Sequence, residues 1–203
     1  MTLIYTLSFN FSVLLPLLAQ FALGGGAALY AQLLAAMGTG SLLGALVMAS
    51  RRRPSPRVLA WSGVGLGIAM AGVAYAPSAA VALSVLAVVG FASMVFMATG
   101  NSMMQIAAAP AMRGRVMAVY AMVFLGSTPI GGPLMGLLAE RSGPRLAFAI
   151  GGAAAVAAAL AALWALHLLG GKGRVPVLLR RLADADPPSV AELPVAAEEP
   201  LSA

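Results

Sequence analysis

The sequence contains no cysteine and very few charged residues, and each scarcity excludes a class of chemistry. Without cysteine the chain has no disulfide, no thiolate nucleophile and no cysteine-based metal site. Only 6 of its 203 residues are acidic, and they form no cluster suited to metal-assisted hydrolysis. The single histidine, His167, lies at the end of an apolar run, where it cannot face a serine inside a bilayer as a protease requires. We therefore expect no enzyme, no metal site and no cofactor.

The sequence is rich in apolar residues. Hydrophobic residues make up 61% of the chain and the mean hydropathy is +0.96, far above the averages for a soluble domain. The 12 basic residues fall into short clusters without interleaved aromatic residues, a pattern typical of membrane orientation and not of nucleic-acid binding. The first residues lack the basic segment of a cleavable signal peptide. The composition predicts a multi-pass membrane protein.

The charge-free runs predict six spans. No charge appears before Arg51, and three consecutive glycines divide that stretch into two helices. The expected spans are 2–23, 27–50, 58–76, 79–108, 116–139 and 146–169. The predicted fold class is an all-α membrane protein with a six-helix domain over residues 1–170. Beyond it, proline, alanine and charge over residues 171–203 predict a mostly disordered cytoplasmic tail.

The basic residues predict the orientation of the spans. Six spans place both termini on one side of the membrane. Ten basic residues then share that side: Arg51, Arg52, Arg53, Arg57, Arg113, Arg115, Lys172, Arg174, Arg180 and Arg181. Only Arg141 and Arg145 lie on the other side, next to Glu140. The positive-inside rule predicts cytoplasmic termini in the cell membrane.

Two segments of the chain resemble each other. GALVMASRRRPSPRV (44–58) aligns without a gap on GPLMGLLAERSGPRL (132–146), and each segment ends the second helix of a three-helix group. Three spans separate the copies. Because three is odd, the copies face opposite sides of the membrane, as in the inverted 3+3 repeat found in halves of secondary transporters.

Polar side chains gather in the fourth span. Met97, Asn101, Met104 and Gln105 follow one another at helical steps, and Asn10 lies within the first span. Since lipid cannot satisfy a carboxamide, these residues are candidates for a substrate path. The alternatives are hydrogen bonds to neighbouring helices, worth about 0.6 kcal/mol per pair, and ordinary packing for the methionines.

Glycine and proline predict contacts and bends. The G-x-x-x-G pairs Gly40/Gly44, Gly63/Gly67 and Gly132/Gly136 are expected at close helix contacts, since no strand precedes them as a nucleotide-binding loop requires. Pro16, Gly126 and Pro129 are expected to bend their helices.

Four segments resemble a known family: 10–20 (NFSVLLPLLAQ), 44–57, 98–132 (ATGNSMMQIAAAPAMRGRVMAVYAMVFLGSTPIGG) and 138–145 (LAERSGPR). On these residues the chain resembles the C-terminal six-helix half of the major facilitator superfamily, in the exporter branch of siderophore exporters and transmembrane secretion effectors. The resemblance implies that the first and fourth spans line the cavity. It also implies that the arginines of loops 51–57 and 113–115 steady a gate. The family usually has an aspartate before the first of these loops, where this chain has Ser50.

The resemblance implies a function as well. We expect a transporter that exports a small molecule by alternating access, in a lipid bilayer, with an N-terminal six-helix half or a second copy as partner. The alternative is a membrane protein that inserts and packs but transports nothing.

Overall fold

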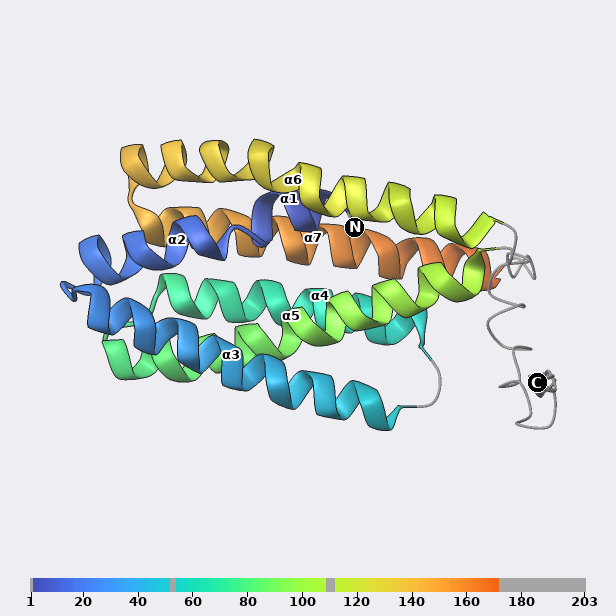
Figure 1. Ribbon diagram of the computed structural model, residues 1–203, viewed down its shortest axis with the longest axis horizontal. Helices are drawn as coiled ribbons and strands as arrows, with labels where there is room; N and C mark the ends of the chain where they lie inside the picture. Colours follow the sequence, from blue (N-terminus) through green and yellow to red (C-terminus); the bar gives the residue numbers. More distant parts are fainter. Residues whose placement is uncertain (1, 52–53, 109–111, 172–203) are drawn as a thin grey trace, which may run out of the picture.

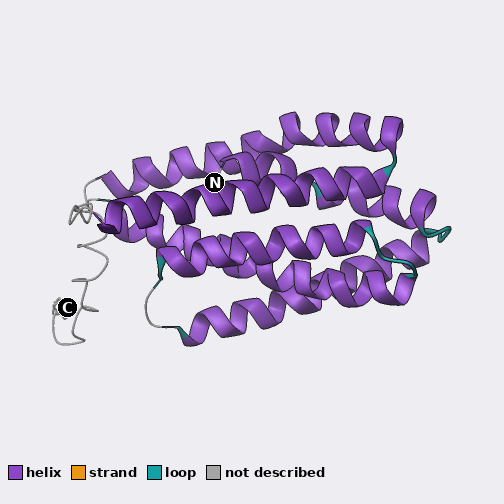
Figure 2. Cartoon of the chain, turned by 180° about the vertical axis from the view of Figure 1, so that it is seen from behind, coloured by secondary structure: helices purple, strands orange, loops and turns teal. Residues whose placement is uncertain are grey.

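The computed structural model describes residues 2–51, 54–108 and 112–171, which form a bundle of long helices with short connections (Figure 1). In chain order these are α1 (Thr2–Ser8), α2 (Phe11–Leu17), the π-helical turn η1 (Leu18–Ala22), α3 (Ala27–Ser50), α4 (Pro56–Ala74), α5 (Ala79–Ala107), α6 (Arg113–Ser142) and α7 (Pro144–Gly171). Within these ranges there is no strand (Figure 2).

Six stretches of the described chain are long and apolar enough to cross a membrane. The first comprises Ile4–Ala22 and the others follow α3 to α7. This confirms the predicted fold class, an all-α membrane protein with six transmembrane helices. We refer to α1, α2 and η1 together as the first span. The tail predicted beyond α7 lies outside the described residues.

The connections divide the bundle into two ends. The α3–α4 and α5–α6 connections and the last turn of α7 lie at one end, which we call the basic end because Arg51, Arg57, Arg113 and Arg115 are there (Figure 1). The α6–α7 turn, with Glu140, lies at the opposite end. α1 begins part-way along the bundle, beside α7.

Local sequence explains where several helices start. Ser55 precedes α4 and Pro56 opens it, a position where the missing N–H of proline costs nothing. The Ser78 hydroxyl accepts a hydrogen bond from the Val81 amide at the start of α5. Gly143 adopts a φ of 86° between α6 and α7, a conformation that suits glycine alone, and Pro144 then begins α7.

Glycines bring α3 and α5 into backbone contact. A Cβ atom added to Gly40 would lie 1.8 Å from the Ala87 carbonyl oxygen, and one added to Gly90 would lie 2.0 Å from that of Met37. The Ser41 hydroxyl donates to the Gly90 carbonyl at 3.2 Å across this contact. A side chain larger than hydrogen at these positions would force the two helices apart.

The other helix contacts use glycine in the same way. A Cβ atom on Gly67 of α4 would lie 2.4 Å from the Gly152 carbonyl oxygen of α7, which confirms close packing at the first two G-x-x-x-G pairs. The third pair, Gly132 and Gly136, faces Val13 at ordinary contact distance. The close contact of α6 is instead made by the neighbouring Gly131, because that residue lies directly against the first span.

The packed helix pairs form a regular pattern. α3 packs on α5, α4 packs on α5 and α7, and the first span packs on α7 and α6. For these pairs, exchanging the first three spans for the last three returns the same set, whereas the contact between α6 and α7 has no α3–α4 counterpart of similar extent. An inverted 3+3 repeat requires this pattern, and the repeat itself stays a prediction.

The α3–α5 contact generates a test of stability. Gly40→Ala places a methyl group against the Ala87 carbonyl, and we expect it to destabilise the protein by about 1–3 kcal/mol through overpacking. Gly38→Ala on the same helix has nothing within 4 Å and gains the same helix propensity. Thermal unfolding in detergent should show a lower Tm for the first variant only. Equal Tm values would contradict the contact.

Candidate substrate path

The first span is interrupted at Phe9 and Asn10, where the sequence predicted one continuous helix. α1 ends at Ser8 and α2 begins at Phe11, with Asn10 between them at φ −96° and ψ 39°. The side chain of Asn10 is 1% exposed. Its amide nitrogen donates to the Thr6 carbonyl, while its Oδ1 atom accepts no hydrogen bond from the part of the chain that the structure describes.

Neighbouring helices hold this break in place. A Cβ atom on Gly131 of α6 would lie 2.0 Å from the Thr6 carbonyl oxygen and 2.8 Å from Nδ2 of Asn10, so the α6 backbone lies directly against the break. On the other side, the buried Ser8 hydroxyl donates to the Gly151 carbonyl of α7 at 2.9 Å. Interrupted membrane helices line the binding sites of many transporters, because their free backbone groups require a partner.

The residues predicted to bend the helices, Pro16, Gly126 and Pro129, do not lie at the break around Asn10. Pro16 falls inside α2, and η1 follows two residues later. Pro16 and Gln20 line a cavity of about 390 Å³ next to the connection to α3. Pro129 lies inside α6, which changes direction near its middle, where Gly126 also lies (Figure 1). The main interruption of the first span is therefore at Asn10 and not at Pro16.

An aromatic cluster surrounds Tyr5, just before the break. The Tyr5 ring makes edge-to-face contacts with Phe9, Phe96, Tyr120 and Phe124, at centroid distances of 5.0–6.1 Å. The Tyr5 hydroxyl is hydrogen-bonded to that of Tyr120 at 2.8 Å. The cluster joins α1 to α5 and α6, and each ring pair contributes about 0.5–1.5 kcal/mol beyond its buried area.

A cavity of about 380 Å³ lies beside this cluster, between α1, α5 and α6. We call it the tyrosine cavity. Its lining residues are Tyr5, Met104, Met112, Arg115, Val116, Val119, Tyr120 and Val123. Its walls are almost wholly apolar, and Arg115 is the only charged side chain among the described residues that line it.

A second cavity of about 510 Å³ lies between α3 and α5 at the basic end. We call it the amide cavity, because Gln105 and Ser102 line it together with Arg51. Nε2 of Gln105 donates to Oδ1 of Asn101 at 3.0 Å. The amides thus satisfy each other in part, while the exposed Gln105 keeps further donors and an acceptor free.

The structure distributes the predicted path residues over two sides of α5. Met104 lines the tyrosine cavity, Gln105 lines the amide cavity, and Met97 and Asn101 are half-buried and line neither. The predicted polar face of this helix is therefore divided between two neighbours. Asn10 lies on the first span, against α6.

The predicted gating residues lie at both ends of the bundle and are exposed. Arg51, Arg57, Arg113 and Arg115 are at the basic end, whereas Glu140, Arg141 and Arg145 are at the opposite end (Figure 1). Arg52 and Arg53 lie outside the described residues. Glu140 is the only carboxylate in the described part of the chain. Among the described residues, the arginines of the basic end therefore have no carboxylate partner.

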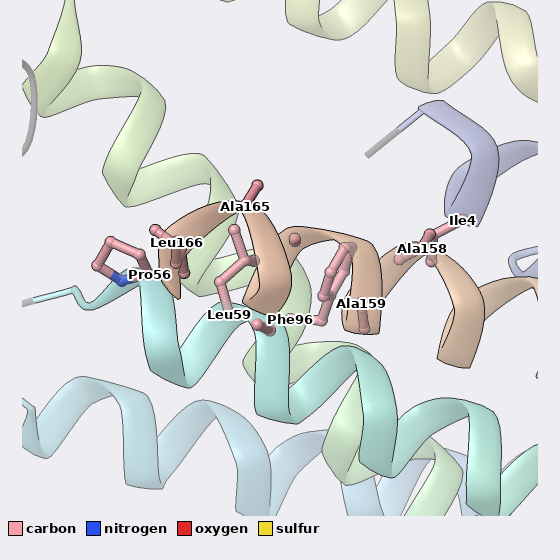
Figure 3. A pocket seen from close by; sticks show the side chains of 10 residues that line it. Ile4, Pro56, Leu59, Phe96, Ala158, Ala159, Ala165 and Leu166 are labelled. Atoms are coloured by element: carbon pink, nitrogen blue, oxygen red, sulfur yellow. The ribbon is translucent and has the colours of Figure 1, made fainter. Parts of the chain in front are cut away.

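A further groove is lined by none of the candidate site residues. A groove of about 310 Å³ lies between α4 and α7, and Phe96 and Ile4 also line it. Figure 3 shows the lining side chains. Apolar side chains such as Leu59, Ala159 and Leu166 line it. Without a polar side chain this groove offers nothing that would orient a solute.

Sequence reasoning missed the two tyrosines of the cavity as site residues. A usable signal was present: Tyr5 and Phe9 are four residues apart, and so are Tyr120 and Phe124. Aromatic residues at this spacing lie on one face of a helix. Two such faces on different spans indicate an aromatic contact between those spans.

A bundle of six membrane-spanning helices with an interrupted first span and cavities between its helices is an architecture typical of membrane transporters. The chain matches the model of the transmembrane secretion effector family over residues 2–174. It therefore belongs to that family, a family of transporters within the major facilitator superfamily, which confirms the resemblance seen in the sequence. No curated protein and no solved structure matches the chain.

The tyrosine pair generates a second test. Tyr120→Phe leaves the hydroxyl of Tyr5, which is 1% exposed, without a partner, and we expect a loss of about 1–3 kcal/mol. Tyr5→Phe should cost less, because Tyr120 is only half-buried. Thermal unfolding of both single variants and the double variant measures the coupling. The exposed Tyr75→Phe is the control, and additive losses would contradict a direct hydrogen bond.

Proposed function

We propose that this chain is the C-terminal six-helix half of an exporter that moves a small molecule across the cell membrane by alternating access. Membership of a transporter family supports transport in general. The observation that carries the proposal further is the tyrosine cavity, which lies between the interrupted first span and α6. Its volume falls within the range of about 300–1,000 Å³ that small-molecule sites occupy.

The proposed path follows α5. Met104 borders the tyrosine cavity. The adjacent residue Gln105, hydrogen-bonded to Asn101, points about 100° around the helix and lines the amide cavity. A solute moving along this helix passes thioethers, amides and tyrosine hydroxyls. The proposal assigns no residue a catalytic role, since transport needs binding and release only.

Charge supports one orientation. The described arginines of the basic end outnumber those of the opposite end by four to two. Each arginine moved to mid-bilayer would cost about 2.5–3.5 kcal/mol on the insertion scale, so both groups must stay outside the hydrocarbon. We place the basic end in the cytoplasm, together with both termini.

Exposed apolar faces support a partner half. α3 and α6 are the least buried of the spans. Their exposed large residues are Leu34, Leu42, Leu43, Leu46 and Val47 on α3, and Val119, Met122, Leu125, Ile130, Leu134 and Leu137 on α6. The two helices also occupy equivalent places in the exchange pattern described above. A second six-helix unit packed against both would close the path, either an N-terminal half or a second copy of this chain.

The alternative is a relative that inserts in the membrane but transports nothing. The exposed faces of α3 and α6 suit lipid as well as protein, and the packing of the bundle requires no solute. Transport measurements separate the two functions.

Engineered cysteines test the orientation, because the native chain has none. Ser50→Cys and Gly114→Cys lie at the basic end, and Ser78→Cys and Ser142→Cys at the opposite end; all four positions are exposed. A membrane-impermeant maleimide should label the second pair in intact cells and the first pair only after permeabilisation. Labelling of one residue from each pair in intact cells would reject the topology.

Export measurements test the path. We expect Asn101→Ala and Gln105→Ala each to lower export by about threefold to tenfold, because each removes a hydrogen-bonding group from the path. Cells would be preloaded with carboxyfluorescein, ethidium or Nile red. The chain would be expressed alone or with any six-helix protein encoded beside it, and dye loss followed by fluorescence.

The matched control is Gln32→Ala, an exposed glutamine on α3 outside both cavities. Unchanged export in both path variants would reject these amides as contacts. If no dye leaves the cells faster than from cells with an empty vector, in any combination of chains, the non-transporting alternative holds.

A further inference from the structure

The tyrosine cavity combines one cation with apolar walls. Arg115 is exposed at the basic end, and no other charged side chain lines the cavity. The only carboxylate in the described residues, Glu140, lies at the opposite end of the bundle. Among the described residues no carboxylate lies near this guanidinium, and a guanidinium can donate charge-assisted hydrogen bonds to an anion.

The walls select the rest of the ligand. Val116, Val119 and Val123 of α6 and Met104 of α5 present no hydrogen-bonding group except a weak thioether acceptor. A sugar or another polyol would leave its hydroxyl groups unpaired there, each at a cost of about 1–3 kcal/mol. An apolar body pays no such cost and gains from leaving water.

The tyrosine pair adds one directed contact. One hydroxyl donates to the other, so a single hydroxyl hydrogen remains for a third partner. Because Tyr5 is buried and Tyr120 half-buried, Tyr120 is the tyrosine that a solute can reach. Its ring edge also suits contact with an aromatic face.

From these three features we infer that the tyrosine cavity binds a lipophilic organic anion, with its negative group at Arg115 and its apolar body against the valines of α6. The inference rests on the proposed transport function, for which it names the substrate class. Cations are disfavoured, because the cavity offers a positive charge and no carboxylate. An anionic phospholipid shares this chemistry, although its two acyl chains exceed a cavity of about 380 Å³.

Equilibrium binding tests the inference without requiring transport. The full chain is placed in nanodiscs of phosphatidylcholine and titrated with 1-anilinonaphthalene-8-sulfonate. A second titration uses N-phenyl-1-naphthylamine, which has the same rings without the sulfonate. Probe fluorescence is corrected with empty nanodiscs. We expect Arg115→Gln to weaken binding of the sulfonate about tenfold and to leave the neutral probe within about twofold.

Matched variants locate the site. Arg113 lies two residues before Arg115 and does not line the cavity. Arg113→Gln removes the same charge and should change neither affinity. Val119→Trp fills the cavity and should abolish binding of both probes, whereas Met122→Trp, at a similarly exposed α6 position that does not line the cavity, should not. Arg115→Lys keeps the charge and should retain most of the sulfonate binding, which distinguishes lost charge from misfolding.

Several results would overturn the inference. These are equal losses in the Arg113 and Arg115 variants, unchanged binding in Val119→Trp, or no binding to the wild-type chain above empty nanodiscs. Nanodiscs that contain phosphatidylglycerol identify the source of the anion: complete displacement of the sulfonate would assign the site to a lipid headgroup and reject a transported anion. Arg115-dependent binding without any dye export would reject the transport function but not the anion site. Dye export without Arg115-dependent binding would reject the anion site but not the transport function.

Discussion

The bundle depends on contacts in which one helix backbone touches another. In lipid there is little hydrophobic gain from bringing two apolar helices together, so association relies on close packing and on polar contacts. Gly40 and Gly90 supply this packing between α3 and α5, and Gly67 and Gly152 supply it between α4 and α7. These two contacts and the α4–α5 contact join α3, α5, α4 and α7 into one packed group of four helices. The first span and α6 pack against α7 of this group.

The helix α6 is held differently, and the tyrosine cavity lies where it packs less closely. Gly131 brings α6 against the first span at one level, but toward the basic end the large side chains of Tyr5, Tyr120 and Phe124 lie between the helices. These rings lie between α1 and α6, and the hydrogen bond between Tyr5 and Tyr120 joins the same two helices. The space that remains is the tyrosine cavity. α6 thus combines one glycine contact, at Gly131, with ring contacts toward the basic end.

Sequence alone predicted the spans because the cost of a charge in lipid exceeds almost every other local preference, so runs without charge had to be helices. The break at Asn10 was not predictable in the same way. An asparagine in an apolar run does not by itself end a helix, and the interruption depends on Gly131 and Gly151 arriving from helices more than a hundred residues later. Helical spacing likewise placed Met104 and Gln105 on one face, but neighbouring positions on a helix point about 100° apart. Only the positions of α3 and α6 around α5 decide which cavity each residue borders.

α5 is therefore a wall shared by two cavities of different chemistry. The α6 side presents valines, thioethers, one guanidinium and one accessible tyrosine hydroxyl. The α3 side presents Gln105, Ser102 and Arg51. Because the Gln105 amide nitrogen donates to Oδ1 of Asn101, the two amides act as one unit. Moving either amide changes the polar surface of the amide cavity. On the proposed path, discrimination by apolar shape belongs to the tyrosine cavity, where an unpaired polar group is costly. The amide cavity can satisfy many polar groups and so discriminates less.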